Sequence, residues 1–122
     1  MNANEIDWKS GHVKFWDLGF LDVNIPLTKQ LSELKEDLAQ ANFPRGLIID
    51  IGWYPEFSED GTFCVKVVHG KQWDQPAMQE RSPTVQGLLL AINRAIAFAE
   101  ACDNMDFDSI GQNDKRCPRE KI

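Results

Sequence analysis

The side chains best suited to chemistry or recognition lie between residues 49 and 74. The stretch IDIGWYPEFSEDGTFCVKVVHG, residues 49–70, joins two apolar runs through a loop in which carboxylates stand beside aromatic rings. Such a group could be a catalytic acid pair, a metal site, a surface that binds a partner, or a solvated turn. Its members and the two similar residues that follow are Trp53, Tyr54, Glu56, Phe57, Glu59, Asp60, Trp73 and Asp74.

The spacing of the acids does not fit catalysis or metal binding. General acid–base catalysis needs two carboxylates held on rigid elements and aimed at one substrate atom. Only Asp50 lies in a predicted strand, and Glu56, Glu59 and Asp60 lie in the loop. A calcium loop needs acids at alternating positions and a closing glutamate, and this spacing is absent. We therefore predict no catalytic residue, no metal site, no cofactor and no enzymatic activity.

A thiol–imidazole pair is also not expected. Cys64 and His69 are five residues apart on one predicted strand, so their side chains point to opposite faces. The chain has an odd number of cysteines, without CxxC or zinc-like spacing, and its N-terminus lacks the pattern of a signal peptide. We therefore expect the three cysteines, which are Cys64, Cys102 and Cys117, to be free thiols in the cytoplasm.

Charge favours a basic protein as the partner. The formal net charge is −6, and residues 1–108 contain nine basic and seventeen acidic residues, a net charge of −8. Nucleic-acid affinity comes largely from neutralised phosphates, so direct binding of nucleic acid is not expected. No apolar run is long enough to span a membrane. An acidic surface steers the approach of a basic partner, and aromatic residues often anchor interfaces.

The elements that must position these residues follow from hydrophobic periodicity. Residues 11–25 predict a β-hairpin or two short strands. Leu27, Leu31, Leu34, Leu38 and Ala41 form the apolar stripe of a helix over about 26–41. Residues 47–53 and 62–69 predict two paired strands, 77–81 a short edge strand, and 83–101 a second helix, capped by Ser82 with Pro83 at its first position. We predict an α+β fold, an antiparallel sheet of about four to five strands with two helices packed on one face. Residues 1–102 would form one domain, and 103–122 a flexible charged tail.

Residues 47–101 resemble the small αβ module of HicB-type antitoxins. The matching pieces are IIDIGWYPEF, SEDGTFCVKVVHG, AMQERS and PTVQGLLLAINRAIAFAEA, which follow that family's order of strand, acidic turn, strand, short strand and helix. The stretch GKQWDQP departs from the family's Pro-rich segment. In size, charge and layout the whole chain is similar to immunity proteins of bacterial toxin systems. Both resemblances imply an inhibitor that neutralises a basic partner, such as a nuclease toxin, by surface contact.

Two alternatives remain open at this level. The first is a small enzyme or ligand-binding domain with a pocket around Asp50 and His69, in which Arg45, Lys66 or Arg81 pairs with Asp50. The second is a structural protein that oligomerises, for instance as a homodimer, through a strand edge or the helix over 83–101.

Overall fold

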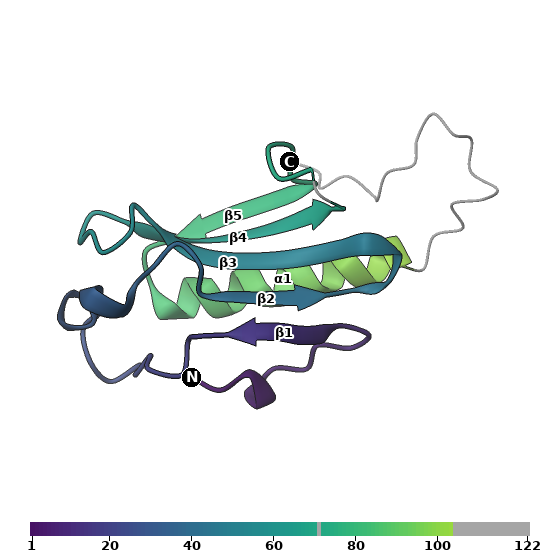
Figure 1. The fold of residues 1–122 in the computed structure, drawn as a ribbon. Coiled ribbons are helices and arrows are strands. Elements are labelled where there is room, and N and C mark those ends of the chain that lie inside the picture. Colours follow the sequence, from purple (N-terminus) through teal and green to yellow (C-terminus); the bar gives the residue numbers. More distant parts are fainter. Residues whose placement is uncertain (71, 104–122) are drawn as a thin grey trace.

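A computed structural model of the chain describes residues 1–70 and 72–103 (Figure 1). Five antiparallel strands follow one another across a single sheet in chain order, and one α-helix packs behind it. The class is therefore α+β, as predicted. The elements are β1 (His12–Trp16), β2 (Ala39–Asn42), β3 (Leu47–Tyr54), β4 (Thr62–His69), β5 (Met78–Ser82) and α1 (Val85–Asp103).

The central pair of strands forms because both are rich in β-branched residues, which pack well on a pleated surface. β3 and β4 pair over their whole lengths, with Leu47 opposite His69 and Tyr54 opposite Thr62. The prediction of two paired strands over 47–53 and 62–69 is confirmed, and so is the short edge strand, which is β5.

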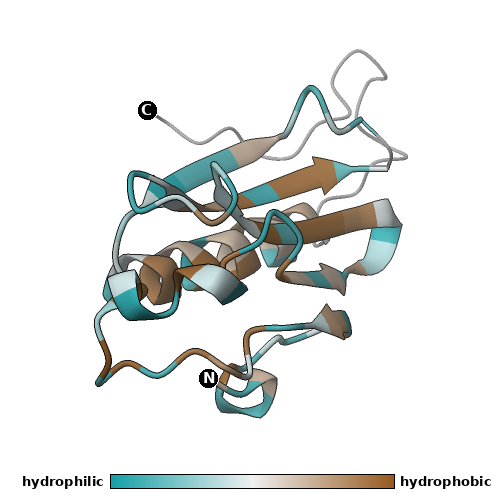
Figure 2. Ribbon diagram, turned by 60° about the vertical axis from the view of Figure 1, so that its left-hand side comes forward, coloured by the Kyte–Doolittle hydropathy of each residue, from teal (hydrophilic) through white to brown (hydrophobic). Residues whose placement is uncertain are grey.

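One face of the sheet carries the core. α1 packs mainly against β4 and β5, and its buried stripe meets Ile49, Ile51, Val65 and Val67. The stretches before and after β1 supply further core residues, and Figure 2 shows hydrophobic segments both in the strands and in the chain that leads to β2. The buried apolar residues of these stretches are Trp8, Leu18, Leu21, Leu34 and Leu38.

The predicted helix over 26–41 is wrong. This stretch forms two short 3-10 turns, Leu27–Lys29 and Leu31–Glu33, and then enters β2. Residues 39–42 pair with β1 on one side and β3 on the other, and a helix would leave both partner strands without these bonds. The strand pairing overrides the helical spacing of the leucines, so one α-helix packs on the sheet, not two.

Residues 11–25 also differ from the prediction of a hairpin. Only β1 is a strand, and its partner is β2, far along the chain. The residues that follow β1 turn back in loops closed by backbone bonds, from the amide of Leu21 to the carbonyl of Leu18 and from that of Ile25 to Asp22. The predicted tail begins inside α1, which runs to Asp103, and residues 104–122 lie outside the described residues.

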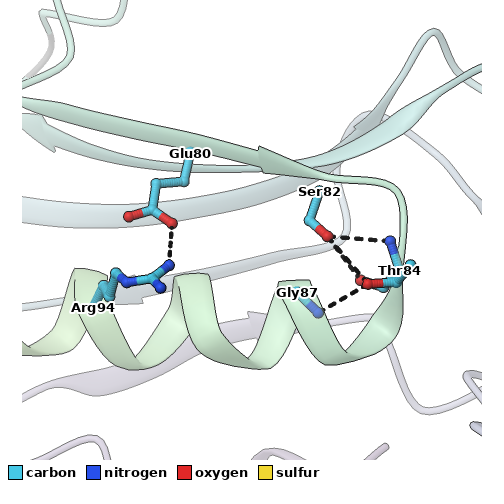
Figure 3. Close-up of polar contacts among 5 residues, drawn as sticks. All are labelled: Glu80, Ser82, Thr84, Gly87 and Arg94. Carbon is cyan, nitrogen blue, oxygen red and sulfur yellow. Dashed lines mark hydrogen bonds and ion pairs between the residues drawn. The ribbon is translucent and has the colours of Figure 1, made fainter.

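The start of α1 is held by two hydroxyl groups (Figure 3). The Thr84 hydroxyl oxygen accepts the amide of Gly87 at 3.0 Å, which makes Thr84 the capping residue. Ser82, predicted as the cap, lies at the end of β5 and accepts the Thr84 amide at 3.1 Å. Further along the helix, the Arg94 guanidinium group donates to the Glu80 carboxylate of β5 at 2.8 Å, and this ion pair links the helix to the edge of the sheet.

Replacing Thr84 by alanine removes the acceptor for the Gly87 amide, so we expect the free energy of unfolding to fall by about 1 kcal/mol. Thr84→Ser keeps the hydroxyl and is the matched control, expected to remain within about 0.5 kcal/mol of the wild type. Urea unfolding of both variants measures the difference. Equal losses in the two variants would show that the hydroxyl is not what stabilises this helix end.

The expectation that no apolar run could span a membrane does not hold by length and composition alone, because the window Val85–Cys102 of α1 passes both criteria. Its apolar residues have a role within the fold, because the stripe that faces the sheet is buried. That stripe consists of Leu88, Ala91, Ile92, Ala95, Ile96 and Ala99.

Candidate acidic contact surface

The loop between β3 and β4, residues 55–61, is fixed by bonds to its own ends. The Trp53 indole N–H donates to the Ser58 carbonyl at 2.8 Å, and the amide of Gly61 donates to the same oxygen at 3.0 Å. A side chain at Gly61 would lie 2.4 Å from the Trp53 indole nitrogen, so glycine permits this close approach. These hydrogen bonds and the close approach at Gly61 therefore fix the conformation of the loop.

The same loop is bonded to residues 34–36. The Phe57 amide donates to the Leu34 carbonyl at 2.8 Å, and the Glu36 amide donates to the Glu56 carboxylate at 3.3 Å. Phe57 itself has φ of +63°, a left-handed conformation that is uncommon for a residue with a side chain. This geometry leaves Phe57 48% exposed beside the acids.

These contacts gather six exposed carboxylates at one end of the sheet, which we name the acidic end. Lys35 lies among them, and its ammonium group forms an ion pair with Asp17. The pKa of Lys35 is raised chiefly by the hydrogen bond to Asp17, with contributions from Glu33 and Asp37. The six acids are Glu33, Glu36 and Asp37 of the stretch before β2, and Glu56, Glu59 and Asp60 of the β3–β4 loop.

Gly52 is what lets the first half of the acidic end lie against β3. The amide of Trp53 donates to the Lys35 carbonyl at 2.8 Å, so the chain at 35–37 runs beside the strand. A Cβ atom at Gly52 would lie 1.9 Å from the Glu36 carbonyl oxygen. Only glycine allows the backbone of Glu36 to pass over the strand at this distance.

The structure does not bring all the predicted surface residues together. Trp73 and Asp74 lie in the β4–β5 loop, at the opposite end of β4 from the acidic end (Figure 1). Eight residues of strand separate the two loops, roughly 25 Å at the usual rise. Trp53 is buried against Phe63, with ring centroids 4.9 Å apart, and belongs to the core. The prediction of one cluster is therefore wrong for these three residues.

Sequence reasoning missed Glu33, Glu36 and Asp37 as members of the surface. The pattern placed them on the polar side of the predicted helix. Their proximity to the β3–β4 loop rests on backbone bonds between residues about twenty positions apart, and no local pattern records such bonds.

A second group of polar side chains occupies the sheet face opposite α1. Asp50 is buried and accepts a hydrogen bond from the Gln40 amide at 3.1 Å. Its neighbour on β4 is Lys66, whose ammonium nitrogen lies 5.5 Å from the centre of the Tyr54 ring. Of the partners considered for Asp50, Lys66 is thus its cross-strand neighbour, and Gln40 supplies the hydrogen bond.

The pKa shifts in this group all favour uncharged side chains. Burial raises the pKa of Asp50, and nearby Asp37 raises it further, against the effects of Gln40 and Lys66. Burial, with the charge of Asp50 and other nearby acids, raises the pKa of Tyr54 to about 12. Burial also raises the pKa of the Cys64 thiol. A nucleophile needs the opposite shift, and the charges of Arg81 and Lys66, which act to lower the Cys64 pKa, are outweighed by burial.

His69 does not join this group. It lies opposite Leu47 on the face that carries the core, at the end of β4, whereas Asp50 and Cys64 lie on the other face. The separation of Cys64 and His69 is as expected from strand alternation. The pocket considered around Asp50 and His69 has no geometric basis, because the sheet stands between the two side chains.

Replacing Asp50 by asparagine should stabilise the protein at neutral pH. A folded-state pKa above the unfolded value means that the unfolded state releases its proton first, so stability falls as pH rises from 3.8 through the folded pKa. The asparagine side chain keeps an acceptor for Gln40 without the charge. We expect the free energy of unfolding to rise at pH 7, with the gain vanishing below the unfolded pKa. Urea unfolding across this range measures the difference, and a loss at pH 7 would contradict the result.

The cysteines differ from one another. Cys64 is a free and buried thiol, as predicted. Cys102, at the end of α1, is disulfide-bonded, so the expectation of free thiols is wrong for it.

Within the described ranges 1–70 and 72–103, no three histidine, cysteine, aspartate or glutamate side chains gather in a way that could hold a metal ion. The chain matches no protein-family model, no curated protein and no solved structure. Function must therefore be argued from the surfaces themselves.

Proposed function

We propose that the protein binds a basic protein partner through the acidic end, in the manner of an immunity or antitoxin-like inhibitor. The observation that carries the proposal is the hydrogen-bonded contact between residues 34–36 and the β3–β4 loop, which places six exposed carboxylates and one exposed aromatic ring at the same end of the sheet. A surface fixed before binding loses little conformational entropy when the partner arrives, and this favours affinity.

The charge of the acidic end suits a basic partner. Lys35 is committed to Asp17, and the six carboxylates are exposed to solvent. A surface of one sign attracts a partner of the opposite sign, so a cationic partner is favoured over an anionic one. Phe57 would supply the apolar anchor at the centre of the contact, a role in which large apolar side chains dominate binding energy.

The polar group at Asp50 does not supply an activated nucleophile. The pKa values of Asp50, Tyr54 and Cys64 are all raised, which keeps the hydroxyl and the thiol in their neutral forms. The same proposal places the protein in the cytoplasm and holds that its binding inhibits the partner.

A tagged copy of the full chain, used to capture proteins from the native cell lysate, tests this function. We expect one basic protein in stoichiometric amount at low salt and its loss at high salt, because exposed charges are screened. Recovery of the chain alone, or retention of a partner that salt does not affect, would contradict the proposal.

A further inference from the structure

A cleft lies beside the N-terminal residues, at the end of the sheet where β1 ends and α1 begins. Its volume is about 450 Å³, within the range of sites that hold a ligand or an inserted side chain. It is formed by the first residues, the loop after β1 and one residue of α1. The apolar side chains of its wall include Ile6, Phe20, Leu21, Val23 and Leu89.

Two of these side chains are not used by the core. Val23 is 64% exposed, and Leu89 is half-buried but does not pack against the core cluster, unlike its neighbour Leu88, which is fully buried. Leu90, next along α1, is 54% exposed. Concave sites with an apolar wall are where proteins commonly hold a ligand or an inserted side chain.

The charged side chains of the cleft have one sign. Glu5 and Asp22 belong to the lining, and none of the described residues that line it is a lysine, arginine or histidine. The Asp22 carboxylate accepts the Asn24 amide at 2.9 Å, a bond within its own turn that leaves the negative charge in place. The ammonium group of Met1 donates to the Leu21 carbonyl at 2.8 Å. The site thus combines an apolar wall with two carboxylates and the ammonium group of Met1, which leaves the lining net negative.

We propose that this cleft docks a basic amphipathic segment of a protein partner, with leucine-like side chains in the cleft and lysine or arginine beside Glu5 and Asp22. Charge complementarity selects a cationic segment over an acidic one. The strong exposure of Val23 favours a macromolecular surface over a small molecule, because a small ligand needs most of its own surface enclosed. This site does not depend on the proposed use of the acidic end.

The probe is a fluorescently labelled helical peptide made of leucine and lysine with an amphipathic pattern, titrated with the full chain by fluorescence anisotropy. We expect saturable binding, and no binding of the same peptide with glutamate in place of every lysine. The variant Val23→Ser/Leu89→Gln should weaken binding at least tenfold, on the order of one interface anchor. Val23→Ser alone changes an exposed residue, so this variant should fold normally. Its affinity for the peptide should still fall about threefold.

Charge and location are tested by two further variants. Glu5→Gln/Asp22→Asn should weaken binding about fivefold and reduce its salt dependence. Glu56→Gln/Glu59→Gln/Asp60→Asn, at the acidic end, should leave binding of the peptide within about twofold. The proposal is overturned if the cleft variants bind the peptide as the wild type does. It is also overturned if the acidic-end variant, and not the cleft variants, loses affinity for the peptide. The proposal is also overturned if the chain does not bind the peptide but self-associates, and the Val23→Ser change dissociates it. That result would identify a second copy of the chain as the occupant.

Discussion

Gly52→Ala should cost about 3 kcal/mol of the free energy of unfolding, at the upper end for one added methyl group. The methyl carbon would lie 1.9 Å from the Glu36 carbonyl oxygen, which is backbone and cannot rotate away. Either the strand or the chain at 35–37 must move, and both are held by the bond from the Trp53 amide to the Lys35 carbonyl. Urea unfolding at neutral pH measures the loss.

Gly19→Ala is the matched control for this prediction. A Cβ atom at Gly19 meets no other atom within 4 Å, so we expect a change of at most about 0.5 kcal/mol. Equal stability of the two variants would mean that the chain at 35–37 does not lie on β3 as described, and the first half of the acidic end would lose its support.

Neutralising the loop acids should weaken the binding of the basic partner about thirtyfold. The change is Glu56→Gln/Glu59→Gln/Asp60→Asn, and each exposed charge contributes roughly 0.7 kcal/mol to an ionic contact. The three side chains are exposed, so folding should be unaffected. Isothermal titration calorimetry with the captured partner at low and at high salt measures both the affinity and its salt dependence, which should fall in the variant.

Trp73→Ala/Asp74→Asn is the comparison variant, because it removes an exposed aromatic ring and a charge at the other end of β4. We expect it to bind within about twofold of the wild type. A large loss in this variant, together with normal binding by the acidic-end variant, would move the contact surface to the β4–β5 loop.

The strands and the helix that could be predicted are those whose own pattern decides their structure. β3 and β4 are dense in β-branched residues, and the apolar stripe of α1 continues for about three turns, so local pattern and tertiary packing agree. β2 could not be found in this way. Its residues AQAN have no strand signal of their own, and they pair because β1 and β3 lie on either side.

Part of the candidate site could likewise be predicted from local sequence pattern. The acids and Phe57 of the β3–β4 loop stand out in the sequence, but Glu36 reaches them only through the path that Gly52 allows. The position of Trp73 follows from topology alone. Successive turns of an antiparallel meander leave alternate ends of the sheet, so the β3–β4 and β4–β5 loops cannot meet.

Hydrogen–deuterium exchange of the full chain, with and without the captured partner, tests the acidic end most directly. The contact surface should show as slower exchange of the backbone amides in residues 33–37 and 55–61 of the complex, with residues 72–77 unchanged. Protection confined to residues 72–77, or unchanged exchange over 33–37 and 55–61 in a saturated complex, would contradict the assignment of partner binding to this end of the sheet.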